Sequence, residues 1–252
     1  MHIYAPSPRL LLTLILGASL LTACSKTDSA AQLAEARENL VAGDTKTAMI
    51  QLKNVVAEDE KNAEARYELG KLYLDQADLA SAEKEFRRAR EAGHAASIVN
   101  PMIARVMLAQ REYQRMLDEL PAPADNSPAA ATLQALRATA ELGLGRKDDA
   151  RKTIQNALQT APDNVEVQLA LAQLALAEGD AEKAMQALDQ ALRREPKHRD
   201  SLLLKGDLLR ATRKSTEAAA IYRELIQLEP KHTQARLALA SIAIADNRLD
   251  EA

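Results

Sequence analysis

The chain contains few aromatic residues and only one cysteine. Phe, Tyr and Trp make up 2% of its 252 residues, and there is no Trp. Because aromatic side chains supply much of the buried area of a bulky core, their scarcity argues against one large core and favours thin layers of Ala and Leu. Because Cys24 is alone, a disulfide within the chain is impossible and a cysteine-based metal site is excluded.

An excess of charge of one sign is also lacking. The 33 basic and 36 acidic residues are interspersed and give a formal net charge of −3. Nucleic-acid binding needs positive charge gathered on one surface, so we expect no nucleic-acid partner. The abundant residues Ala, Leu, Glu, Lys, Arg and Gln all favour helices, which predicts an all-α chain.

The N-terminus has an uncharged run, Leu10 to Ala23, that follows Arg9 and is 14 residues long. A membrane-spanning helix needs roughly 20 residues, so this run is read as the core of a signal peptide. The motif "LTAC" ending at Cys24 resembles a bacterial lipobox, in which the cysteine is acylated and the peptide is cut before it. The resemblance implies a signal peptide over 1–23, lipidation of Cys24 and a membrane contact through the lipid anchor. The alternative is an ordinary cleaved signal with an incidental cysteine.

Ser25 stands where an inner-membrane retention signal would carry Asp. By resemblance to Gram-negative lipoproteins, this favours an outer-membrane lipoprotein that faces the periplasm.

Small residues recur at a fixed interval along the rest of the chain. Counting back from Ala252 in steps of 34 gives Ala218, Ala184, Ala150, Met116, Ala82 and Ala48. Three prolines, Pro162, Pro196 and Pro230, keep the same spacing. A period of this length predicts stacked copies of one supersecondary unit, because a single unit cannot bury its own apolar stripe.

The pattern within each period resembles the tetratricopeptide repeat (TPR), two antiparallel helices per unit. In "YELGKLYL", Leu69, Gly70 and Tyr73 match the first helix of that family, and Ala82 and Phe86 match the second. The first and third units match less well. The resemblance implies an all-α fold, a TPR α-solenoid or right-handed superhelix of antiparallel helix pairs, over residues 24–252. Small residues let the two helix axes approach, so enlarging Ala184 to Leu should overpack the contact by about 1–3 kcal/mol.

Caps and period together predict the helix limits, with Gly93 as a helix stop and Pro101 in a first turn. The expected helices are 29–42, 45–58, 63–76, 79–92, 100–110, 112–120, 128–143, 147–160, 164–178, 180–194, 199–212, 215–228 and 232–246. Residues 121–128 are expected to form a loop. Ala252 takes the small position of a second helix, so we expect about six units plus a truncated seventh, in a sequence that is a fragment of a longer solenoid.

No motif of catalysis or of cofactor binding is found, so the chain is expected not to be an enzyme and to hold no cofactor, metal or small-molecule substrate. His198 and His232 both stand in "EPKH", one period apart. A metal pair is conceivable, but repeated turn chemistry is the preferred interpretation. Acidic pairs such as Asp148 and Asp149 suit helix starts, where negative charge complements the macrodipole.

The remaining candidate is the concave groove, through which TPR proteins bind protein partners. The resemblance implies that helix-A positions two, five, nine, twelve and thirteen line it, mixing apolar and polar side chains as a peptide groove would. These positions include Tyr67, Lys71, Leu74, Thr139, Leu142, Leu169, Gln173, Leu176, Leu203, Asp207, Arg210, Leu237, Ser241 and Ile244. The alternative is that they form an exposed solenoid face without a ligand. The Lys and Asn pattern of TPR domains that clamp a chaperone's terminal carboxylate is absent.

The lipobox, the segment from Asn62 to His94 and the segment from Val99 to Pro121 together resemble the N-terminal portion of the PEP-CTERM system (exosortase-associated) TPR-repeat lipoproteins. That resemblance implies a non-catalytic periplasmic scaffold for protein–protein interactions in an exopolysaccharide and PEP-CTERM (exosortase) export system. Two alternatives stay open. One is an outer-membrane assembly factor or pilotin-like TPR lipoprotein, and the other is the TPR regulatory portion of a longer enzyme.

Overall fold

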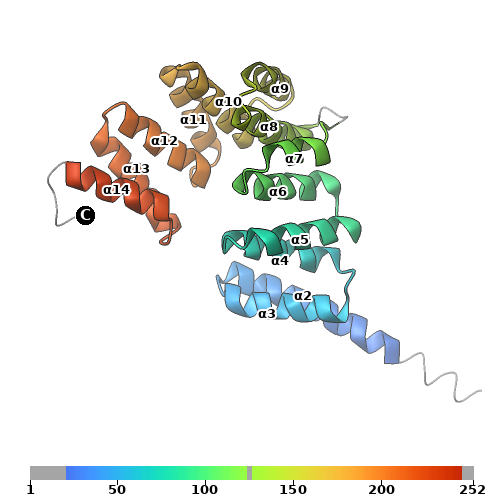
Figure 1. Ribbon diagram of the computed structural model, residues 1–252. Helices are drawn as coiled ribbons and strands as arrows, with labels where there is room; N and C mark the ends of the chain where they lie inside the picture. The colour runs from blue at the N-terminus through green and yellow to red at the C-terminus, as the bar shows by residue number, and fades with distance from the viewer. Residues whose placement is uncertain (1–20, 124–126, 246–252) are drawn as a thin grey trace, which may run out of the picture. The chain divides into compact units, whose positions relative to one another are not determined.

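The computed structural model describes residues 21–123 and 127–245, with side chains from Ser29 onward (Figure 1). All regular structure in these ranges is helical, as the sequence predicts, and no strand occurs in them. The chain divides into two compact units, Met1–Val106 and Met107–Ala252, and each is described by itself.

The first unit consists of two complete hairpins and the start of a third. The helices are α2 (Leu21–Val41), α3 (Thr45–Glu58), α4 (Ala63–Asp75), α5 (Leu79–Glu91) and the first part of α6 (Ala96–Ala109). Helices α2 and α3 pack as one pair and α4 and α5 as the next. The core between the two pairs is small, with Ala36, Leu52, Val55, Ala65 and Leu69 buried together.

The second unit continues the same pattern. After the end of α6 come α7 (Tyr113–Glu119), α8 (Pro128–Gly143), α9 (Lys147–Thr160), α10 (Val165–Glu178), α11 (Ala181–Arg194), α12 (Arg199–Ala211), α13 (Ser215–Leu228) and α14 (Thr233–Ala245). Helix α10 is the most enclosed, because it packs against α8, α9 and α11. Its buried residues are accordingly found on almost every side, as expected for an inner helix of a stack.

The turn inside each hairpin repeats the same backbone geometry. A residue with positive φ closes the first helix at positions 43, 77, 111, 145, 179 and 213, which are 34 residues apart. At Gly145 the amide N–H donates to the Leu142 carbonyl at 2.9 Å, and the next N–H, of Arg146, donates to the Glu141 carbonyl at 2.8 Å. This pair of bonds is a Schellman motif, which satisfies two carbonyls at the helix end. The period of the sequence is therefore also a period of the backbone.

The closest approach of the two helices in a hairpin follows a rule of size. A Cβ added to Gly70 would lie 2.6 Å from Cδ1 of Phe86, and one added to Gly206 would lie 2.7 Å from Cε1 of Tyr222. Where the second helix offers an aliphatic residue instead, as Leu188 does, the first helix has an alanine, here Ala172. Glycine on the first helix is thus paired with an aromatic residue on the second helix, sixteen residues further along the chain, as Gly70 is with Phe86. The volume of the pair is kept while its members change.

Helix α7 is short, and a side chain from α8 donates hydrogen bonds to carbonyl groups at its C-terminal end. It has seven residues, against 13 to 14 in the second helices of the other hairpins. The Arg137 guanidinium of α8 donates to the Leu117 carbonyl at 3.1 Å and also to the Leu120 carbonyl. Partial burial lowers the pKa of Arg137 from its usual value. A half-buried arginine therefore satisfies carbonyls that a longer helix would have bonded itself.

Two predicted helix starts were wrong. Helix α2 begins at Leu21 and not at residue 29, and neither proline nor glycine interrupts the chain between Leu21 and Ser29. Helix α6 begins at Ala96 and not at 100, since the amides of Ile98 and Val99 already donate to the Ala95 carbonyl. Pro101 consequently lies inside the helix rather than in its first turn. Its missing N–H leaves a single carbonyl near the helix start without its usual partner.

Candidate partner-binding site

The predicted groove residues of the first unit lie together on one face of α4. Tyr67, Lys71 and Leu74 follow at intervals of four and three residues, so they share a face. The Tyr67 ring is half-buried and stacks on the ring of His94, with the centroids 4.6 Å apart. Lys71 is exposed, and its Nζ lies 5.6 Å from the centre of the Tyr67 ring and 2.8 Å from Oε2 of Glu68. Burial raises the pKa of Tyr67 above its ordinary value.

Two further cations belong to this face, and the sequence-based set did not include them. Arg37 and Arg105 stand one period before and one period after Lys71. Arg37 of α2 forms an ion pair with Glu64 of α4, and its side chain stays 48% exposed. Arg105, on α6, is half-buried, and its positive charge acts against the rise in the pKa of Tyr67. The 34-residue spacing is the sequence signal that points to both, although their own units match the family pattern less well.

In the second unit, two of the predicted residues of α8 and α10 are joined by a hydrogen bond, and the other three are leucines. Thr139 Oγ1 donates to Oε1 of Gln173 at 2.8 Å, which joins equivalent positions of two successive hairpins. Leu142 and Leu176 are half-buried. Leu169 is only 6% exposed and packs in a cluster with Ala172 and Leu208, so in this structure it serves the core.

The predicted residues of α12 are held by polar contacts. Asp207 Oδ1 accepts from the Tyr222 hydroxyl at 2.7 Å, and its Oδ2 accepts from Nε2 of Gln234 at 3.4 Å. Arg210 lies 3.8 Å from the same carboxylate and is 50% exposed, and Leu203 is half-buried. Burial, followed by the bond to Asp207, raises the pKa of Tyr222 to about 12. Asp207 therefore positions neighbouring side chains as well as facing the groove.

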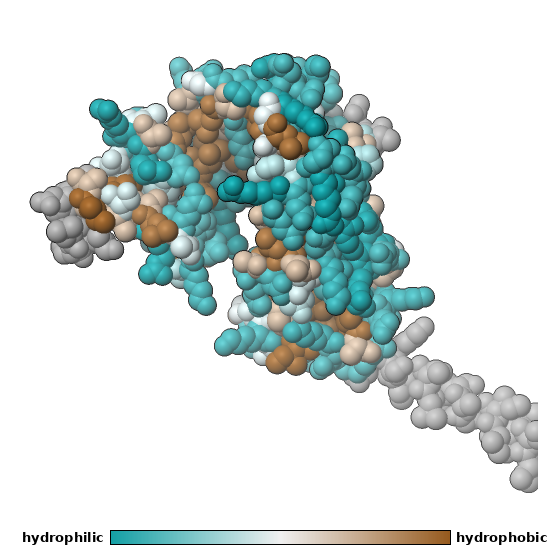
Figure 2. All heavy atoms as spheres, in the orientation of Figure 1, coloured by the Kyte–Doolittle hydropathy of each residue, from teal (hydrophilic) through white to brown (hydrophobic). Residues whose placement is uncertain are grey.

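The predicted residues of α14 are the most accessible of the set. Leu237 is 67% and Ile244 59% exposed, and Ser241 between them is exposed as well. Apolar surface is visible at this end of the chain in the space-filling view (Figure 2). The predicted residues are thus distributed over patches in two separately described units, and which of them bind a partner stays a prediction.

The two histidines of the repeated "EPKH" turns both begin helices. His232 Nδ1 accepts from the Ala235 amide at 3.2 Å, so the imidazole caps α14 as Asp or Asn caps other helices. His198 precedes α12, with Nδ1 2.8 Å from Ser201 Oγ and Nε2 3.2 Å from Glu166 Oε1. The contacts of His232 with Ala235 and of His198 with Ser201 are local turn contacts, whereas the contact of His198 with Glu166 joins successive hairpins. Among the residues that the structure describes, no cluster of His, Cys, Asp and Glu could hold a metal ion.

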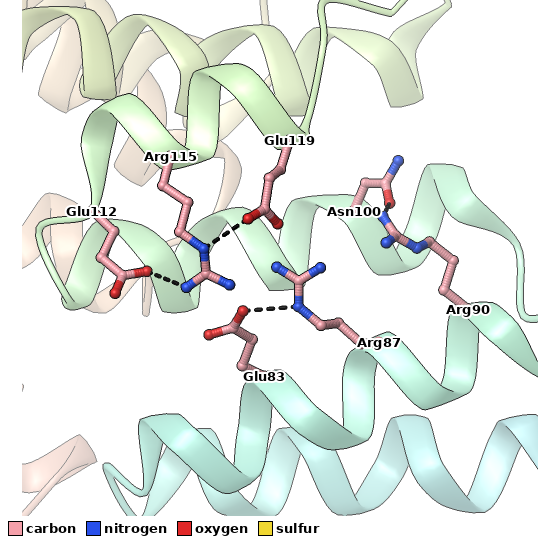
Figure 3. A network of polar contacts seen from close by, with 7 residues as sticks. All are labelled: Glu83, Arg87, Arg90, Asn100, Glu112, Arg115 and Glu119. Carbon is pink, nitrogen blue, oxygen red and sulfur yellow. Dashed lines mark hydrogen bonds and ion pairs between the residues drawn. The ribbon is translucent and has the colours of Figure 1, made fainter.

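Many other surface charges pair within their own helices, which indicates a structural role. Arg87 Nε lies 2.8 Å from Glu83 Oε1 on α5, and Arg115 bridges Glu112 and Glu119 around α7 (Figure 3). Pairs at three- and four-residue spacing stabilise a helix by roughly 0.2–0.5 kcal/mol each.

The anchor prediction falls outside what the structure describes. Residues 1–20 and the side chain of Cys24 are not among the described parts of the chain. Within the described residues, no helix is both long and apolar enough to span a bilayer.

Stacked helical hairpins with a 34-residue step, a left-handed turn residue in each and small residues between their helices define a helical repeat protein. Sequence models described as tetratricopeptide repeat match residues 40–106 and 140–208 in one case and 203–252 in the other. The chain belongs to the tetratricopeptide repeat family. It is therefore an all-α TPR scaffold of the kind that mediates protein–protein interactions.

Solved structures share this fold at low sequence identity. PilF of Pseudomonas aeruginosa is 19% identical, with a TM-score of 0.55 over 86% of this chain and 99% of PilF. PilW, described as a widely conserved type IV pilus biogenesis factor, is 16% identical, with a TM-score of 0.53 over 84% of this chain and 98% of PilW. The Cut9–Hcn1 structure matches with a TM-score of 0.60 at 13% identity, over 91% of this chain and 46% of the matched chain. No curated protein matches the sequence.

Proposed function

We propose that this protein is a lipid-anchored, periplasm-facing TPR scaffold that binds protein partners in an exopolysaccharide and PEP-CTERM (exosortase) export system. The observation that carries the scaffold role is the face of α4 on which Tyr67, Lys71 and Leu74 offer an aromatic, a cationic and an apolar contact within about two helical turns. Such mixed faces suit an extended or helical peptide. The export context is supported by the resemblance of the lipobox and of the segments around units two and three.

The anchor is tested first. In a Gram-negative host supplied with radiolabelled palmitate, the wild-type protein should be labelled and Cys24→Ser should not. Ser25→Ala is the matched control, since it alters the next side chain and leaves the thiol in place. Equal labelling of wild type and Cys24→Ser would remove the anchor from the proposal.

The export role is tested in a strain that produces exopolysaccharide and encodes this protein. Deletion should reduce secreted polysaccharide or surface display of PEP-CTERM proteins, and envelope cross-linking should recover components of that system with the wild-type protein. A Lys71→Glu variant, folded by circular dichroism, should recover less of them. Unchanged secretion in the deletion strain would overturn the export role.

A second candidate is an assembly factor of a pilus or a related outer-membrane machine. It is supported by the similarity to PilF and PilW, which extends over nearly the whole of both proteins. If the deletion strain loses surface pili and twitching motility while polysaccharide secretion is normal, this second role replaces the first.

A further inference from the structure

A row of cations runs along the partner-binding face of the first unit. Arg37, Lys71 and Arg105 occupy the same position in three successive hairpins, 34 residues apart on α2, α4 and α6. The equivalent positions of the second unit hold Thr139, Gln173, Asp207 and Ser241, which carry no positive charge. The row is therefore a feature of the first unit and not of the repeat as such.

Arg37 and Lys71 are accessible although they are partly neutralised, and Arg105 is half-buried. Arg37 pairs with Glu64, and Lys71 pairs with Glu68 at 2.8 Å. The side chains of Arg37 and Lys71 remain 48% and 45% exposed, whereas that of Glu68 is only 13% exposed. Because both cations keep about half of their side-chain surface exposed, an incoming carboxylate can approach each of them and share it with its existing partner.

Apolar side chains accompany the cations. Leu40 and Leu74 are half-buried and stand three residues after Arg37 and Lys71, nearly one helical turn along the same face. The half-buried Tyr67 ring stands one turn before Lys71. A ligand that follows the row thus meets charge and apolar surface in alternation. A polypeptide with acidic and apolar side chains fits both, whereas a uniformly hydrophilic polyanion uses only the charge.

We propose that the first unit binds an acidic polypeptide segment with interspersed apolar residues. Its carboxylates pair with Arg37, Lys71 and Arg105, and its apolar side chains contact Leu40, Leu74 and the Tyr67 ring. This inference rests on the proposed role of the groove as a partner site and names the partner's chemistry. Since charge complementarity acts mainly on association and specificity, binding should weaken steeply as salt is added.

The test uses the full chain and a fluorescently labelled acidic peptide built from a Glu-Glu-Leu repeat, with binding followed by fluorescence anisotropy at low salt. Lys71→Glu should weaken binding about tenfold or more, because one attraction becomes a repulsion. Glu68→Gln removes the competing carboxylate and should strengthen binding. The matched control is Lys84→Glu, the same charge change at an exposed site on α5, and it should leave the affinity unchanged.

Circular dichroism establishes that each variant is folded. The inference is overturned if the acidic peptide does not bind, if Lys71→Glu and Lys84→Glu weaken binding equally, or if Glu68→Gln weakens it. It is also overturned if an oligosaccharide of alginate binds in a Lys71-dependent way and the peptide does not. If the peptide does not bind but deletion of the protein still reduces export, only this inference fails. If the peptide binds but deletion leaves export unchanged, only the export role fails.

Discussion

The pairing of glycine with an aromatic ring predicts the effect of adding one methyl group to Gly70. Its Cβ would lie 2.6 Å from Cδ1 and Cε1 of Phe86, closer than the 3.0 Å that real Cβ atoms respect. Phe86 is fully buried between the helices of its hairpin, so the ring cannot swing into solvent. Helices α4 and α5 must therefore separate, and overpacking of this kind costs about 1–3 kcal/mol. Alanine's better helix propensity offsets up to about 1 kcal/mol of that cost.

The measurement is denaturant unfolding followed by circular dichroism. Gly70→Ala should lower the unfolding midpoint. The double variant Gly70→Ala with Phe86→Leu reproduces the size pairing of Ala172 with Leu188, so it should recover much of the loss that the two single variants would add up to. Ala172→Gly makes the opposite exchange beside Leu188, so it combines a helix-propensity cost of about 1 kcal/mol with the loss of one buried methyl group. If Gly70→Ala is neutral, or if the double variant loses the full sum, the size rule is refuted.

Three other perturbations follow from the turns, caps and short helix. Arg213 holds a left-handed backbone with φ of 63°, so Arg213→Gly should stabilise the chain, while Gly145→Ala should destabilise it by roughly 1 kcal/mol, as read from thermal unfolding. Hydrogen bonds at the helix starts lower the pKa of Asp44 and Asp78 below 3.8, so their stabilising contribution is present above that pH and is lost as the pH falls through the lowered values. A double substitution of both to Asn should flatten acid unfolding in that range. Arg137→Met should cost about 1–3 kcal/mol by leaving two carbonyls without a donor, and amide exchange near α7 should speed up; unchanged exchange would contradict the capping role.

Much of the fold could be predicted from the sequence because several kinds of residue repeat with the same 34-residue period. The small residues, the turn glycines and the prolines all repeat at 34, so the hairpins and their turns were predicted correctly over most of the chain, including the stop at Gly93. The errors came from local signals used in isolation. The prediction that Pro101 lies in a first turn placed the helix start at residue 100, yet backbone hydrogen bonds to Ala95 begin the helix earlier.

The candidate site was less predictable than the fold. Family positions located the face of α4, and Lys71 and Tyr67 indeed lie together on it. Sequence spacing could not show that Leu169 packs in the core or that Asp207 is engaged by Tyr222, because both depend on contacts between different hairpins. Arg37 and Arg105 were missed because their own units match the repeat pattern poorly, although their charge and register were visible.

The left-handed turn residues have a practical consequence. Their motif is closed by main-chain groups alone, and nothing lies within 4 Å of a Cβ placed at Gly145 or Gly179. Ala77, Arg111 and Arg213 show that a side chain is tolerated at this point of the motif. Single cysteines for fluorophores or spin labels, placed at the three non-glycine turns in a variant whose natural thiol is removed, would therefore report on individual hairpins at little structural cost. Because these turns recur at 34-residue intervals, a label at each one would report ligand contact or local unfolding in a single known repeat.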